Sequence, residues 1–181
     1  MEMNLPNKLT ILRVILIPVF LVVLLGRFIP SPLNRYIAIG IFIIASLTDM
    51  LDGHIARSRN LVTNFGKFMD PLADKLLVSA AMIAMVEMGD IPSWVVIIII
   101  SREFAITGFR ILAIEANKVI AASWWGKIKT TTQMIMIIYI LIGFKGVVLQ
   151  SIGSFLIGLA TLFTIISGVD YIVKNIDVLK G

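Results

Sequence analysis

Residues 49–74 read DMLDGHIARSRNLVTNFGKFMDPLAD, a stretch rich in polar residues in which two long apolar runs of the chain meet. The first run covers approximately Leu33–Ile55 and the second approximately Pro71–Met88. Four aspartates lie where these runs approach their short connection: Asp49, Asp52, Asp70 and Asp74. A carboxylate inside the hydrocarbon region of a membrane costs at least a few kcal/mol, so such residues face a polar cavity and are functional by default. The stretch therefore predicts a functional site where two helices meet.

The composition indicates a membrane protein. Of 181 residues, 59% are hydrophobic and 15% are charged, and there is no cysteine. Soluble domains contain about 45–50% apolar and about 25% charged residues. A soluble enzyme, a disordered chain and a disulfide-stapled secreted domain are therefore excluded. At roughly 20 residues per crossing, residues 1–181 suit a single domain with about six membrane helices.

Six apolar segments, separated by turn or breaker residues, predict an all-α integral membrane protein, a bundle of six transmembrane helices. The segments are approximately Leu9–Phe28, Leu33–Ile55, Pro71–Met88, Ser93–Ile114, Ile128–Phe144 and Ile152–Val173. If the amino terminus is cytoplasmic, nine basic residues lie in the cytoplasmic loops and chain ends, and three lie in the loops on the outer side of the membrane. The positive-inside rule then places both termini in the cytoplasm, in a multi-pass protein of the cell membrane. The net charge of +5 is spread between segments, so we expect no nucleic-acid partner.

The spacing of the aspartates gives the predicted site its chemistry. Asp49 and Asp52 are three residues apart and Asp70 and Asp74 four apart, so each pair lies on one helix face. Four close carboxylates need a compensating cation. Oxygen ligands suit Mg²⁺ or Mn²⁺, and the absence of cysteine and the single histidine argue against zinc. Two such ions about 3.5–4 Å apart clamp the attacking and leaving oxygens in phosphoryl transfer.

Small and basic residues in the same stretch suit a phosphorylated ligand. Gly53 and Ala56 keep one helix face free of bulk, and Arg57 is placed to meet a phosphate. Two alternatives stay open at this point. The acids could cap helix ends or pair with nearby basic residues, or they could form the ion site of a six-helix cation transporter. Their clustering at one cytoplasmic turn, with no partner cluster in the second half, argues against the transporter.

Residues 49–74 resemble the signature of the CDP-alcohol phosphotransferases, D-x-x-D-G-x-x-A-R-x(8)-G-x-x-x-D-x-x-x-D. All eight fixed positions are filled, by Asp49, Asp52, Gly53, Ala56, Arg57, Gly66, Asp70 and Asp74. The resemblance implies a six-helix membrane core whose site faces the cytoplasm. It implies that Asp49, Asp52 and Asp70 ligate a pair of divalent metal ions, with Asp74 as the general base and a further ligand. Gly53, Ala56, Arg57 and Gly66 would contact the nucleotide and its pyrophosphate.

The resemblance also implies a reaction among membrane lipids. An alcohol attacks the lipid-bearing phosphorus of CDP-diacylglycerol, and CMP leaves. Residues 4–13 (NLPNKLTILR), 101–110 (SREFAITGFR) and 122–133 (ASWWGKIKTTTQ) resemble the family members that act on glycerol 3-phosphate. In those members Asn7, Thr10 and Arg13 would lie against the nucleotide. Relatives are commonly homodimers, so the same is expected here.

Basic residues outside the signature predict an anionic acceptor. Arg102 and Arg110 are eight residues apart, about two helical turns, and so share a helix face. With Lys127, Lys129 and Lys67 they would form a pocket for the phosphate of glycerol 3-phosphate. Inositol phosphate, serine and phosphatidylglycerol stay open as acceptors. Arg102 could instead pair with Glu103 or another acid, and Lys127 and Lys129 could simply follow the positive-inside rule. Asp170 is expected to pair with Lys174 structurally.

Overall fold

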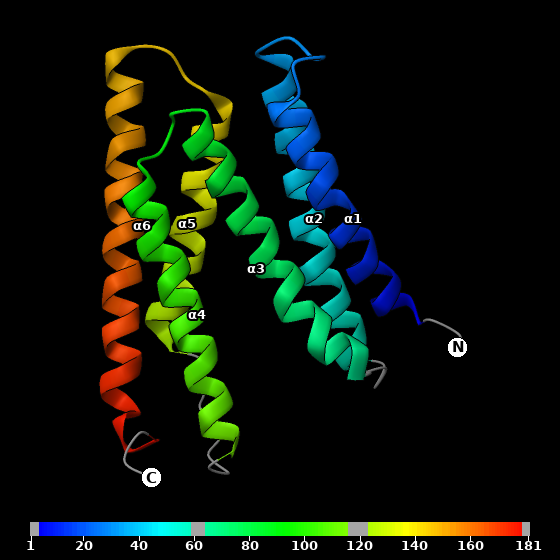
Figure 1. Cartoon of the computed structure of the whole chain (residues 1–181), viewed down its shortest axis with the longest axis vertical. Helices are drawn as coiled ribbons and strands as arrows, with labels where there is room; N and C mark the ends of the chain where they lie inside the picture. The colour runs from blue at the N-terminus through cyan, green and yellow to red at the C-terminus, as the bar shows by residue number, and fades with distance from the viewer. Residues whose placement is uncertain (1–3, 59–63, 116–122, 179–181) are drawn as a thin grey trace. The chain divides into compact units, whose positions relative to one another are not determined.

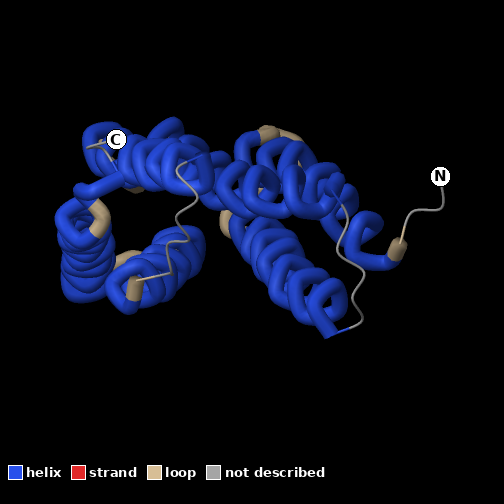
Figure 2. Tube along the Cα trace, turned by 90° about the horizontal axis from the view of Figure 1, so that it is seen from below, coloured by secondary structure: helices blue, strands red, loops and turns tan. Residues whose placement is uncertain are grey.

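The computed structural model describes residues 4–58, 64–115 and 123–178, all of them helix or connecting loop (Figure 1 and Figure 2). For residues 5, 49–58, 64–65, 67–68, 71, 114–115 and 178 it describes the backbone alone. The helices are α1 (Leu5–Leu25), α2 (Leu33–Ser58), α3 (Asn64–Glu87), α4 (Ser93–Glu115), α5 (Trp124–Ile142) and α6 (Val147–Lys174), followed by the short 3₁₀ helix η1 (Ile176–Val178). The predicted all-α architecture with six helices is confirmed for the described residues.

Each helix overlaps one predicted apolar segment, but several helices begin earlier. Helix α1 begins at Leu5 because the Asn4 side chain caps it, accepting a hydrogen bond from the Asn7 amide at 3.1 Å. Helices α5 and α6 begin four and five residues before the predicted segments. The added first turns of α1, α3 and α5 include polar or capping residues, which hydropathy does not detect, whereas the added start of α6 is itself largely apolar. The predicted boundaries were therefore displaced at the amino ends.

The connection within residues 49–74 is also shorter than the sequence indicated. Helix α2 continues to Ser58 and α3 begins at Asn64, so Gly53, Ala56 and Arg57 lie on α2 and Gly66 lies on α3. The expected breaker stretch from Gly53 to Gly66 is thus mostly helical. A single glycine costs a helix only about 1 kcal/mol, which favourable neighbours offset.

The chain divides into two compact units. The first comprises Met1–Met88 and Leu141–Gly143, and within it α1 packs against both α2 and α3. The facing residues repeat at helical spacing, so each helix presents one apolar stripe. Phe20 of α1 meets Phe42 of α2 with ring centroids 6.1 Å apart. The other buried apolar residues on α1, α2 and α3 are Ile17, Leu24, Ala38, Ala45, Ala73, Leu77, Ala81, Met82, Ala84 and Met85.

The second unit comprises Gly89–Ile140 and Phe144–Gly181, and within it α4 packs against α6. The inner stripe of α6 is made of small and hydroxyl residues: Gly153, Ala160, Thr161, Thr164, Ser167, Gly168 and Tyr171. The hydroxyls of Thr164 and Ser167 donate to backbone carbonyls of their own helix, at 2.7 and 3.0 Å. This stripe therefore lets α4 approach closely without leaving those two buried donors unsatisfied.

Two described helices are long and apolar enough to cross a membrane, over Pro6–Leu25 and Val147–Lys174. Large apolar side chains of α6 are exposed outside the inner stripe, including Val147 at 82% and Phe155 at 66%. Such exposure is costly in water and ordinary in lipid. Crossing of the membrane by all six helices, with both termini inside, stays a prediction.

Candidate active site

The four signature aspartates lie on α2 and α3, which run in opposite directions on either side of residues 59–63 (Figure 1). Asp49 and Asp52 lie nine and six residues before the end of α2, and Asp70 and Asp74 six and ten residues after the start of α3. At 1.5 Å per residue, all four lie about 9–15 Å along their helices from the connected ends. The backbone therefore places both pairs at similar distances from the connected ends of their helices. The side chains of Asp49 and Asp52 lie outside the described residues.

Asp70 is held by a residue 60 positions earlier in the chain. The buried Thr10 hydroxyl on α1 lies 2.6 Å from Asp70 Oδ1 and 3.2 Å from the Pro6 carbonyl oxygen. The shorter distance makes the carboxylate the main acceptor of the single hydroxyl proton. Helix α1 thus orients a carboxylate of the signature directly.

Arg13, one turn further along the same buried face of α1, contacts α2. Its Nε donates to the carbonyl oxygen of Ala45 at 3.2 Å, and Thr48 donates to the same oxygen at 2.6 Å. Arg13 is fully buried, and Ala45 lies one helical turn before Asp49. The buried face formed by Asn7, Thr10 and Arg13 therefore contacts both helices of the signature. Sequence reasoning placed these three residues at the nucleotide and did not anticipate their helix contacts.

The donor set of the first unit suits a hard divalent cation. Asp70 and Asp74 offer carboxylate oxygens one helical turn apart on α3, with Asp70 half-buried and Asp74 exposed. Among side chains that the structure describes, no group of three or more metal-binding residues gathers at one point. Because Asp49 and Asp52 lie outside that set, their part in the predicted site is not tested. Oxygen donors without sulfur fit Mg²⁺ or Mn²⁺.

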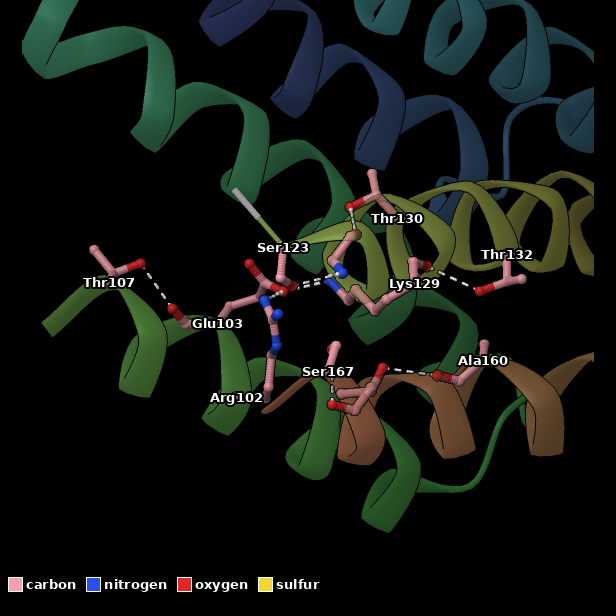
Figure 3. A network of polar contacts seen from close by, with 11 residues as sticks. Arg102, Glu103, Thr107, Ser123, Lys129, Thr130, Thr132, Ala160 and Ser167 are labelled. Carbon is pink, nitrogen blue, oxygen red and sulfur yellow. Dashed lines mark hydrogen bonds and ion pairs between the residues drawn. The ribbon is translucent and has the colours of Figure 1, made fainter. Parts of the chain in front are cut away.

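The second unit holds a partly buried ionic cluster (Figure 3). We call Arg102 and Glu103 of α4 together with Lys129 of α5 the Glu103 cluster. Oε1 of Glu103 accepts from the Lys129 ammonium and lies 3.2 Å from Nη1 of Arg102. The exposed fractions of the Lys129, Arg102 and Glu103 side chains are 5%, 14% and 21%. Two predicted acceptor-binding cations are therefore brought together by an acid. The ion pair of Arg102 with Glu103, considered as an alternative role, is present.

Glycines of α5 and α6 lie beside Arg102, and the one on α6 makes room for its side chain. A Cβ built on Gly168 of α6 would lie 3.2 Å from Cγ of Arg102, and one on Gly126 of α5 would lie 3.9 Å from its Nη2. The stem of Arg102 therefore lies against α6 while its guanidinium lies near the start of α5. The sequence signal for this arrangement is a glycine within the small-residue stripe of α6, which sequence reasoning did not use.

The remaining predicted cations have other partners. The Arg110 guanidinium carbon lies 5.9 Å from the ring centroid of Tyr171, whose ring meets Phe109 edge-on. Lys127 Nζ lies 5.8 Å from the ring centroid of the exposed Trp124. No described contact joins either residue to the Glu103 cluster. The Lys67 side chain lies outside the described residues. Asp170 pairs with Lys174 at 2.6 Å, which confirms that expectation.

Residues 3–166 match the CDP-alcohol phosphatidyltransferase family. The chain belongs to this family. Three similar relatives are all described as CDP-diacylglycerol–glycerol-3-phosphate 3-phosphatidyltransferases. The protein of Bacillus subtilis is 45% identical, with 98% of this chain and 97% of the relative aligned. That of Rickettsia bellii is 39% identical over 93% of both chains. That of Haemophilus influenzae is 44% identical over 75% of this chain and 74% of the relative. The resemblance inferred from residues 49–74 is thereby confirmed at the level of the family.

Replacing Thr10 tests its contact with Asp70. Thr10→Val keeps the shape of the side chain and removes the hydroxyl, so the Asp70 carboxylate loses a short hydrogen bond. We expect the free energy of unfolding to fall by about 1–3 kcal/mol, the usual loss for a hydrogen bond to a charged group. Thermal unfolding of the detergent-solubilised protein measures it. Thr10→Ser is the matched control and should lose less. Equal stability of the two variants would show that the hydroxyl contributes nothing.

Proposed function

We propose that this CDP-alcohol phosphatidyltransferase transfers the phosphatidyl group of CDP-diacylglycerol to sn-glycerol 3-phosphate, giving phosphatidylglycerophosphate and CMP. The observation that supports it best is the complete eight-residue signature in a chain 45% identical, over nearly its full length, to a relative named for this reaction. The Glu103 cluster supports the anionic acceptor, because it concentrates buried cations of the type that bind phosphate.

Asp49, Asp52 and Asp70, with Asp74, would hold two Mg²⁺ or Mn²⁺ ions. When bound, these ions supply positive charge to neutralise the pyrophosphate of the donor. The contribution of the chain is to set the ligands in place. Thr10 directs Asp70, and α1 holds α2 through Arg13 and the Ala45 carbonyl. Ligands fixed in this way lose little conformational freedom when a cation arrives.

Asp74 acts as the general base in the proposed reaction. It lies on the exposed side of α3, one turn beyond Asp70, where it can meet a hydroxyl entering from outside the helix. Asp74 takes the proton of the acceptor hydroxyl as that oxygen bonds to the phosphorus bearing diacylglycerol. The bond from this phosphorus to the bridging oxygen breaks, and CMP departs with the bonding electrons.

The nucleotide of the donor would lie against the signature and α1. Gly53, Ala56, Arg57 and Gly66, with Asn7, Thr10 and Arg13, form this proposed surface. Gly66 is buried near the start of α3, and a residue without a side chain lets a ligand approach the backbone closely. Because Thr10 donates its proton to Asp70, its hydroxyl oxygen would meet the nucleotide as an acceptor.

The acceptor phosphate would bind to Arg102, Arg110, Lys129, Lys127 and Lys67. Among these, Lys129 and Arg102 are already gathered on one carboxylate, and Arg110 is held over the ring of Tyr171. A guanidinium offers paired donors that match the oxygens of a phosphate. Binding of the phosphate in this way would hold the acceptor by one end and leave its hydroxyl free to react.

The setting of the reaction is the cell membrane. We propose one domain over residues 1–181 with six membrane-spanning helices, both termini and the active site on the cytoplasmic side, and assembly as a homodimer among membrane lipids. The two strongly apolar helices and the excess of basic residues in the predicted inner loops support this orientation.

The choice of acceptor is tested with detergent-solubilised protein and CDP-diacylglycerol. We expect CMP release and a labelled lipid product with glycerol 3-phosphate. Serine, inositol phosphate and phosphatidylglycerol should give little of either. Each is supplied separately with radiolabel, and the lipid extract is counted. Product formation with serine but not with glycerol 3-phosphate would overturn the assignment.

Replacing Asp74 separates chemistry from donor binding. Asp74→Asn removes the proton acceptor, so we expect kcat to fall by about 10²–10⁴-fold while metal-dependent binding of CDP-diacylglycerol is partly kept. Turnover and donor binding are measured on the same preparation. Glu87→Gln, near the other end of α3, is the control and should keep normal turnover. Loss of binding with normal turnover per bound donor would contradict the base assignment.

Replacing Arg110 tests its contact with the acceptor. Arg110→Ala removes a cation from the proposed phosphate pocket, so the acceptor KM should rise at least about tenfold. The donor KM should change far less. The exposed Arg27, in the loop after α1, provides the control variant Arg27→Ala. An unchanged acceptor KM in Arg110→Ala would remove Arg110 from the pocket.

A further inference from the structure

We propose that Glu103 is a positioning residue, which holds Lys129 and Arg102 together as a preassembled cation pair for the acceptor's phosphate monoester. This inference rests on the proposed function, because it assigns these cations to the acceptor. Glu103 itself would repel a phosphate, so it acts through its partners rather than by touching the substrate.

One carboxylate oxygen joins two helices in the Glu103 cluster (Figure 3). The Lys129 ammonium on α5 and the Arg102 guanidinium on α4 both contact Oε1 of Glu103. Within α4, Thr107 Oγ1 also donates to the Glu103 carbonyl oxygen at 2.7 Å, which leaves the carboxylate to the two cations. The acid therefore stands at a fixed point of α4 and determines where the end of a long lysine side chain lies.

Burial explains why these cations need an acid. The Lys129 side chain is 5% exposed, and a buried ammonium without a counter-charge is strongly unfavourable. Lysine also has large rotamer freedom, which a charge-assisted hydrogen bond removes before the substrate arrives. Glu103 thus stabilises the charged, inward position of Lys129, and the acceptor does not have to order it.

The charge of the cluster suits a phosphate monoester. Two cations and one carboxylate leave a formal charge of +1, which attracts a dianion more strongly than a zwitterion of zero net charge such as serine. Arg102 retains unused donor capacity, because its Nε is buried without a hydrogen-bond partner among the described residues. With its stem against Gly168, Arg102 is fixed at one side of the cluster while Lys129 is fixed at the other.

The first test compares steady-state constants for both substrates. Glu103→Gln keeps the size and the oxygen of the side chain but removes its charge. We expect the glycerol 3-phosphate KM to rise about tenfold, with kcat and the CDP-diacylglycerol KM within about twofold of wild type. Asp170→Asn is the matched control, because it removes an acid from an ion pair on α6 of the same unit. It should leave all three constants near wild type.

A conservative variant distinguishes charge from packing. Glu103→Asp keeps the charge on a side chain shorter by one methylene, so its acceptor KM should lie between those of wild type and Glu103→Gln. It also provides the test if Glu103→Gln fails to fold, since a rise confined to the acceptor KM supports the proposal there too. Two results for Glu103→Asp would overturn the positioning role. One is an acceptor KM no lower than that of Glu103→Gln, and the other is a donor KM raised as much as the acceptor KM.

A double-mutant cycle shows whether Glu103 acts through Lys129. In the Lys129→Met background, adding Glu103→Gln should change the acceptor KM by less than about twofold, because the cation to be positioned is gone. If the double variant raised the acceptor KM by the product of the two single-variant factors, the result would contradict the proposal. The proposed function fails separately, if wild-type protein releases no CMP with glycerol 3-phosphate. Wild-type activity with an unchanged acceptor KM in Glu103→Gln refutes only the positioning role.

Discussion

Compensation of charge within apolar helices is the constraint on which the candidate site depends. Asp70 is stabilised by the Thr10 hydroxyl, and Lys129 and Arg102 are stabilised by Glu103. An uncompensated charge in such surroundings costs several kcal/mol, so each pairing favours one arrangement of its helices over others. The pairings that stabilise each unit therefore also fix the side chains that we propose to bind cations and anions.

Small residues make this compensation sterically possible. Gly168 leaves room for the Arg102 side chain, and Ala45 presents a carbonyl oxygen that accepts from both Arg13 and Thr48. In a lipid environment, burial of apolar side chains contributes little to helix association. Close van der Waals packing and hydrogen bonds therefore supply a larger share of the stabilisation. The hydroxyl and glycine stripe of α6 is consistent with that requirement, and it is also where the arginines of α4 make contact.

Much of the fold was predictable from patterns along the chain. The six helices follow from runs of apolar residues, and the signature pairs follow from spacings of three and four residues. Helix ends were less predictable from hydropathy. It does not detect a capping residue such as Asn4, and it does not detect helical turns that contain polar residues, such as the last turns of α2 before Ser58. Arg102 had two open roles in the sequence, and the structure shows the pairing with Glu103 without excluding phosphate binding.

The sequence by itself determined the family, the helical class and the residues that we propose for the chemistry, because motif spacing and hydropathy are local properties of the chain. Only the tertiary structure decided which of these residues touch. Thr10 meets Asp70 across 60 positions, and Glu103 meets Lys129 across 26. Such contacts depend on how helix faces rotate and pack against one another. No local pattern specifies that rotation, since it results from the fit of every side chain along the interface.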